Sequence, residues 1–189
     1  MALYIATIKK QYVSALLDES PWVNTYHVTA ADEDGAISIA NGIVDIEKAV
    51  HWSDIAFTKL SVRQDSELAG SGKSVGLSGL GERDATGESF LPSFCTARVT
   101  FTDGIARPDQ KYLRLNINET EQNNGNFETT FLDFLQDNYV APLMGLVGLV
   151  SSDGTTYTSG VVNSVVQMRQ RSWSRRFRPG FKRGWVPTS

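Results

Sequence analysis

The segment "ELAGSGKSVGLSGLGERDATGESF" contains the letters GSGKS, and a lysine followed by serine binds phosphate and magnesium in a P-loop. A P-loop also requires glycine at its first motif position, where the chain turns back so that its N–H groups converge on the phosphates. Glu67 occupies that position. The glycines after Ser74 also disfavour the helix that completes such a site. The sequence therefore predicts a surface loop over residues 65–93 that contacts a partner, and no ATPase site.

Other candidate catalytic groups do not form a recognisable constellation. His27 lies in a predicted strand, and His51 lies at a predicted helix end, where a protonated imidazole would interact favourably with the helix dipole. Neither histidine has a metal-ligand partner three or four residues away, and no G-x-S-x-G elbow is present. We therefore predict that the protein is not an enzyme and has no catalytic residue, metal or cofactor.

Two further features have a structural and a chemical interpretation. The carboxylates Asp32, Glu33 and Asp34 could hold calcium, but their spacing differs from that of an EF-hand loop and favours capping of the helix that follows. The single cysteine, Cys95, cannot form an internal disulfide and lies on the apolar face of a predicted strand. We expect a helix cap and a buried structural thiol.

The C-terminal segment "MRQRSWSRRFRPGFKRGWVPTS" combines aromatic and basic side chains at regular spacing. Its aromatic residues recur at every fourth position, as Trp173, Phe177, Phe181 and Trp185. Between them lie Arg171, Arg175, Arg176, Arg178, Lys182 and Arg183. Pro179-Gly180 excludes one continuous helix. Such an extended arm can bind single-stranded nucleic acid, or its aromatic residues can dock into neighbouring subunits; both interpretations are retained.

The net charge of −3 conceals a division along the chain. From Arg169 onward there are seven basic residues and no acidic one, which leaves eleven basic against twenty-one acidic residues in 1–168. A basic arm on an acidic body is indicated. No apolar run approaches the roughly 18 residues of a membrane span, and the lysines after the first apolar residues are unlike a secretory signal. We therefore expect neither export nor a membrane partner.

The order of predicted elements repeats. Residues 2–13, 22–30 and 54–64 have strand composition, and residues 32–52 place Ile39, Ile43, Ile46 and Val50 on one face of a helix. After the loop, strands are predicted over 94–102, 111–118 and 160–172. A helix over 126–139 is expected to end or kink at Pro142.

These elements predict an α+β fold. We expect a two-layer sandwich in which an antiparallel or mixed sheet carries two helices on one face, with a possible ββαβ pseudo-repeat that no residue-level similarity supports. The predicted organisation is one α+β domain over 1–168, with the glycine-rich loop at 65–93, followed by a basic aromatic arm over 169–189. At 189 residues and 41% hydrophobic content, the chain can bury a core of ordinary size.

The arm "RQRSWSRRFRPGFKRGW" and the long loop on a compact body resemble the layout of coat proteins of small spherical viruses. The resemblance implies that the arm neutralises a packaged genome; it carries no catalytic residue over. Many such coats are all-β jelly rolls with N-terminal arms. The α+β composition is nearer to the coats of single-stranded RNA bacteriophages, although their order of elements differs.

We therefore predict a self-assembling structural protein, foremost a viral coat subunit found in the virion and assembled in the host cytoplasm or nucleus. Its partners would be many copies of itself and single-stranded nucleic acid, either RNA or DNA. Two alternatives remain: a nucleic-acid-binding module that forms no shell, and a phage neck or tail ring component that packages nothing.

Overall fold

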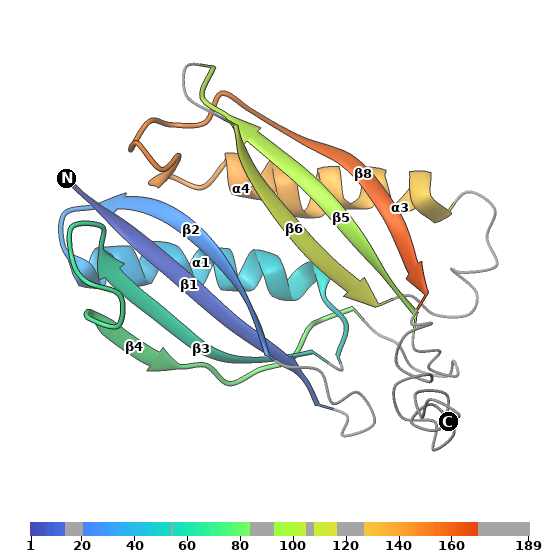
Figure 1. The fold of residues 1–189 in the computed structure, drawn as a ribbon, viewed down its shortest axis with the longest axis horizontal. Helices are drawn as coiled ribbons and strands as arrows, with labels where there is room; N and C mark the ends of the chain where they lie inside the picture. The colour runs from blue at the N-terminus through green and yellow to red at the C-terminus, as the bar shows by residue number, and fades with distance from the viewer. Residues whose placement is uncertain (14–20, 54, 84–92, 105–107, 117–126, 170–189) are drawn as a thin grey trace, which may run out of the picture.

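A computed structural model describes residues 1–13, 21–53, 55–83, 93–104, 108–116 and 127–169. The strands form two antiparallel sheets, and the helices form a second layer behind them (Figure 1), which confirms the predicted α+β class. The larger sheet has the order β4-β3-β1-β2-β7 and the smaller one β6-β5-β8. The C-terminal arm lies outside the described residues.

The first half follows the predicted order, with one addition. It consists of β1 (Ala2–Tyr12), β2 (Trp22–Ala30), α1 (Glu33–Val50), β3 (Ile55–Gln64) and the short edge strand β4 (Lys73–Gly76). The strand β4 lies inside the segment predicted as a loop, so that prediction missed it. The Asp32 side chain accepts a hydrogen bond of 2.8 Å from the Gly35 N–H, which confirms the helix cap.

The second half has β5 (Ser93–Thr102), β6 (Asp109–Asn116), α3 (Phe127–Leu135), the π-helix η1 (Gln136–Val140), α4 (Ala141–Met144), β7 (Leu149–Val150) and β8 (Ser159–Arg169). The helix does not end at Pro142, which occupies the first turn of α4 directly after the π-helix. The missing N–H of proline costs least at that position.

Gln136, the first residue of the π-helix, contacts the backbone of β8 through its side chain. Its side-chain amide donates to the Gly160 carbonyl at 3.2 Å and accepts from the Val162 N–H at 3.1 Å, so it pairs with the backbone of β8 as a strand would. This contact joins the helix layer to the smaller sheet and covers part of the edge of β8.

The two sheets meet edge to edge at β2 and β6 (Figure 1). There the Lys111 ammonium of β6 donates to the Thr25 carbonyl of β2 at 2.7 Å and lies over the Tyr26 ring. The alternating residues that face the helices are buried and form the core between the layers. We call the opposite side of the strands the open face; it faces the viewer in Figure 1.

Candidate nucleic-acid interface

Charge is divided between the two layers. The described helices carry the exposed carboxylates Asp34, Asp45, Glu128, Asp133 and Asp137, and within these helices Lys48 is the one basic residue. The described strands hold one carboxylate, Asp109, which accepts a hydrogen bond from the Tyr157 hydroxyl. Four basic residues alternate with the core positions and lie on the open face: Lys9, Lys59, Arg63 and Arg98. The open face is therefore cationic, and the helix layer is acidic.

Strand register places hydroxyl side chains from four neighbouring strands in one row on the open face. In order across the sheet, this hydroxyl row consists of Ser74, Ser61, Thr7 and Thr25. The Ser61 and Ser74 hydroxyls are 3.0 Å apart and share a hydrogen bond. Because each hydroxyl both donates and accepts, the row can bond to the mixed polar edges of a base or a sugar.

The adjacent row brings two lysines together. Lys9 of β1 lies directly opposite Lys59 of β3, and both are exposed. The register shifts beside this pair, where Thr58 is the extra residue of a β-bulge and its hydroxyl donates to the Lys9 carbonyl at 3.3 Å. Like charges directly opposite on neighbouring strands destabilise a sheet. An anion bound between the two ammonium groups would remove that repulsion.

On the other side of the hydroxyl row, Arg63 and His27 flank Ile5. The Arg63 guanidinium donates to the Glu67 carbonyl at 2.7 Å and so fixes the turn that follows β3. Burial, followed by the nearby charge of Lys111, lowers the pKa of the half-buried His27, so its imidazole is neutral at pH 7.

The glycine-rich segment covers part of this surface. Residues 69–71 form one wall of a hollow of about 420 Å³. Lys59, Arg63, the hydroxyl row and the apolar residues Ile5 and Val62 form the remainder. No carboxylate is among the described residues that line it. Gly72 has a φ of +84°, and a Cβ there would lie 2.2 Å from the Val62 carbonyl oxygen. Glycine is therefore required for the segment to cross the backbone of β3 so closely.

Lys73, the lysine of GSGKS, points away from this hollow. It pairs with Val62, whose side chain is in the core, and its ammonium contacts Asp34 at 2.7 Å and Glu33 at 3.7 Å. Residues 73–76 continue as β4, whereas a P-loop requires a helix. The lysine thus joins β4 to the N-terminus of α1.

A second polar cluster lies in the core. Glu47 of α1 forms an ion pair with Lys10 of β1 and accepts hydrogen bonds from Asn24 and the Tyr26 hydroxyl. The Tyr26 hydroxyl also contacts that of Tyr139 from the π-helix. Lys10 and Glu47 are both 0% exposed, so this cluster holds the two halves together and is closed to a substrate.

Burial determines the ionisation of this cluster. Burial lowers the pKa of Lys10 despite the attraction of Glu47. Burial alone would raise the pKa of Glu47, but the Lys10 charge and the hydrogen bonds hold it below its usual value.

The imidazole of His51 lies at the end of α1 but is not a cation. It is buried, its Nδ1 lies 2.7 Å from the Glu47 carbonyl oxygen, and burial together with the Lys10 charge lowers its pKa to about 4. The imidazole is therefore neutral at pH 7 and donates from Nδ1 to that carbonyl. Desolvation of the imidazolium outweighs its attraction to the helix dipole.

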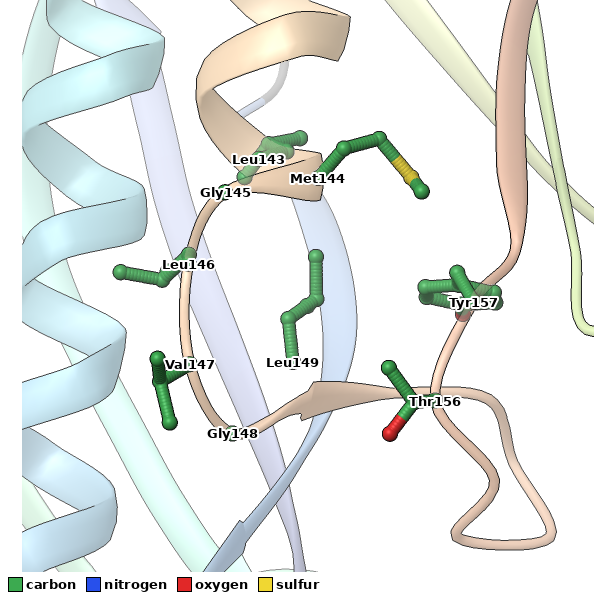
Figure 2. A pocket seen from close by; sticks show the side chains of 9 residues that line it. All are labelled: Leu143, Met144, Gly145, Leu146, Val147, Gly148, Leu149, Thr156 and Tyr157. Atoms are coloured by element: carbon green, nitrogen blue, oxygen red, sulfur yellow. The ribbon is translucent and has the colours of Figure 1, made fainter.

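A pocket lies at the turn after α4 (Figure 2). Its volume is about 240 Å³, and side chains including Met144, Leu146 and Leu149 surround it. Among the described residues that line it, Tyr157 is the one titratable group, and its hydroxyl donates a hydrogen bond to Asp109. The pocket is therefore suited to packing rather than to catalysis.

The predicted arm residues and Cys95 differ in what the structure describes of them. All ten predicted contact residues of the arm, from Arg171 to Trp185, lie outside the described residues and remain predictions. Cys95 lies in β5, but its side chain is not described. Among the described residues, no cluster of histidine, cysteine and carboxylates could hold a metal. No helix in the described ranges is long and apolar enough to span a membrane.

Sequence reasoning missed the open face. The sequence did contain a signal for this face: the alternation in β1 and β3 places Lys9 and Lys59 out of phase with the core residues. The pairing of these lysines depends on register between strands far apart in sequence, which alternation alone does not give.

Comparison with known proteins identifies no relative: no protein-family model, no curated protein and no solved structure matches the chain.

Proposed function

We propose that the chain is a self-assembling structural protein, a viral coat subunit whose open face and C-terminal arm contact single-stranded nucleic acid in the virion. The observation that carries this proposal is the division of charge: cations without carboxylates at the described strand positions of the open face, and carboxylates on the helices. A shell subunit needs one surface that tolerates a dense polyanion, and a cationic face provides it.

Contacts between copies would supply the remaining energy. Val161, Val166 and Tyr112 are each more than half exposed on the open face of the smaller sheet, with exposures of 51%, 51% and 57%. Exposed apolar groups close together favour burial against another chain. The aromatic residues of the arm would add anchors for the same purpose.

The test is the state of the purified full chain. We expect large particles by electron microscopy and size-exclusion chromatography, and an ultraviolet spectrum that reveals bound nucleic acid. Truncation before Trp173 should leave particles that contain little nucleic acid if the arm chiefly neutralises phosphates. A stable monomer at high concentration would contradict the coat proposal.

A second candidate, a nucleic-acid-binding module without a shell, is favoured by one observation. The hydroxyl row and the lysine pair are complete within a single chain. This candidate requires a monomer or small oligomer that binds single strands with strong salt dependence. Particles that form but bind no nucleic acid would instead support a ring or tail component.

A further inference from the structure

We infer that the hollow beneath residues 69–71 binds one nucleotide of a single-stranded nucleic acid, with its phosphate between Lys9 and Lys59. The inference rests on the proposed contact between the open face and nucleic acid. It adds a defined binding site in the folded body, separate from the basic arm.

The lysine pair indicates an anion. Lys9 and Lys59 are exposed and lie opposite one another on neighbouring strands, and the neighbouring open-face positions of the described strands hold no carboxylate. Two ammonium groups so placed repel each other until an anion lies between them. A phosphodiester carries one negative charge per nucleotide, so this pair suits one backbone phosphate.

The hollow indicates what is attached to that phosphate. Its volume of about 420 Å³ lies in the range of small-ligand pockets, roughly 300–1,000 Å³. Lys59 forms part of its wall, and the hydroxyls of Thr7, Ser61 and Ser74 line it. Hydroxyl groups bond to both donors and acceptors, which fits a base and sugar better than a bare inorganic anion.

The row of the lysine pair continues towards the smaller sheet. Lys9 is opposite Val23 of β2, and Val23 lines a groove with Tyr112 of β6, which is 57% exposed. Tyr112 is in turn opposite Arg98 of β5. An exposed ring beside a cation can stack a base while the guanidinium neutralises a phosphate. The strand would therefore run from the hollow across β2 towards Tyr112.

The experiment measures binding of a fluorescently labelled 12-nucleotide oligouridine and its oligothymidine counterpart to the full chain, by anisotropy over a range of salt. Lys9→Gln/Lys59→Gln removes the phosphate contacts. Lys73→Gln is the matched control, because it removes an exposed lysine that faces the helix layer. Circular dichroism melting confirms that each variant is folded.

Loss of two phosphate contacts should reduce the slope of log affinity against log salt by about 1.4. This corresponds to binding about 25-fold weaker at 0.1 M salt if the non-electrostatic part is unchanged. Thr7→Val should weaken binding without changing the slope. Crosslinking of an iodouridine-substituted oligonucleotide should label the peptide that contains Tyr112. Millimolar phosphate should not displace the oligonucleotide.

Three results would overturn the inference. Binding by the lysine double variant that equals that of Lys73→Gln would assign all contacts to the arm, while leaving the coat proposal intact. Displacement by phosphate alone would reduce the site to an inorganic anion site. The double variant could instead bind the oligonucleotide normally but fail to assemble. That result would mean that the lysine pair contacts the acidic helices of a neighbouring copy. Absence of both particles and nucleic-acid binding in the unmodified protein would refute the proposed function itself.

Discussion

The first half of the chain, from β1 to β4, and the second, from β5 to β8, arrange their strands in the same way. In each half a central strand pairs with the strand that follows it and with the strand that returns after the helix. In each, the register shifts along the returning strand, with Thr58 as the extra residue in β3 and Asn163 as the extra residue in β8. The two halves therefore share the ββαβ order of elements and also a β-bulge at the corresponding place.

The bulges allow residues of the two halves to be compared. Lys9 corresponds to Arg98, and the buried Lys10 corresponds to the buried Val99. Lys59 corresponds to Ser164, so the second half has no pair of facing cations at this place. The first half thus has an ion pair in its core and facing cations on its open face, whereas the second half has Val99 at the core position of Lys10 and exposed valines on its open face. One topology supports two surface chemistries.

The largest expected effect comes from breaking the buried charge of the first half. Glu47→Ala leaves the Lys10 ammonium buried without its partner, and such a change costs about 3–5 kcal/mol of unfolding free energy. Lys10→Met/Glu47→Leu, which replaces the ion pair by two apolar side chains, should recover most of that loss. Urea denaturation measures both variants. Equal destabilisation by the single and the double variant would mean that the polar cluster, not the ion pair, determines stability.

The second largest effect is expected from acid, which should destabilise the first half because both histidines lie there. The pKa of His51 is about 4 in the folded protein and about 6.5 when unfolded. Between these values the unfolded state binds more protons, so the unfolding free energy falls as pH falls, by up to about 1.4 kcal/mol per pH unit. Below about pH 4.5, protonation of Glu47 adds to the loss.

His51→Gln tests this assignment. It should flatten the dependence of the urea midpoint on pH between 6.5 and 4.5, while the matched variant His27→Gln, at a half-buried site, should retain most of it. A profile that His51→Gln leaves unchanged would assign the acid sensitivity to other groups.

The apolar open face of the second half should affect assembly more than folding. Val161→Ser/Val166→Ser changes two half-exposed side chains, so the unfolding free energy should change by no more than about 1 kcal/mol in total. If these valines lie between copies, the concentration needed for assembly should rise about tenfold, equivalent to about 1.4 kcal/mol. Light scattering measures assembly, and Val13→Ser, an exposed valine after β1, is the control. Equal effects of both changes would remove the distinction between the halves.

The sequence predicted this fold to the extent that local patterns determine it. Alternation identified the six long strands, and helical spacing identified α1, including the burial of Ile43 and Val50. Spacing did not identify Glu47 as buried, because a carboxylate on an apolar stripe is usually solvated. The signal in the sequence was Lys10, which lies in phase with the buried Ile8 in β1. A lysine at a core position requires a buried partner of opposite charge.

The candidate site was harder to predict than the fold. The hydroxyl row combines side chains from four strands, and β4, which contributes Ser74, lacks the length and composition that reveal a strand in sequence. Each side chain in the row looks ordinary by itself. Only strand register, which depends on packing across the whole sheet, brings them together.

The smallest effect is expected at the lysine that first suggests a nucleotide site. Lys73→Ala removes an exposed ion pair with Asp34 and Glu33, and such pairs contribute little to stability. The hydrogen bond to Asp34 raises the pKa of Lys73, so the ammonium stays charged at neutral pH and serves only to attach β4 to α1. Because the ammonium faces away from the hollow, ATP affinity should be negligible before and after the change, as calorimetry with and without magnesium can measure. Tight magnesium-dependent ATP binding that Lys73→Ala abolishes would show that GSGKS binds phosphate and that the first half carries a different site from the one inferred on its open face.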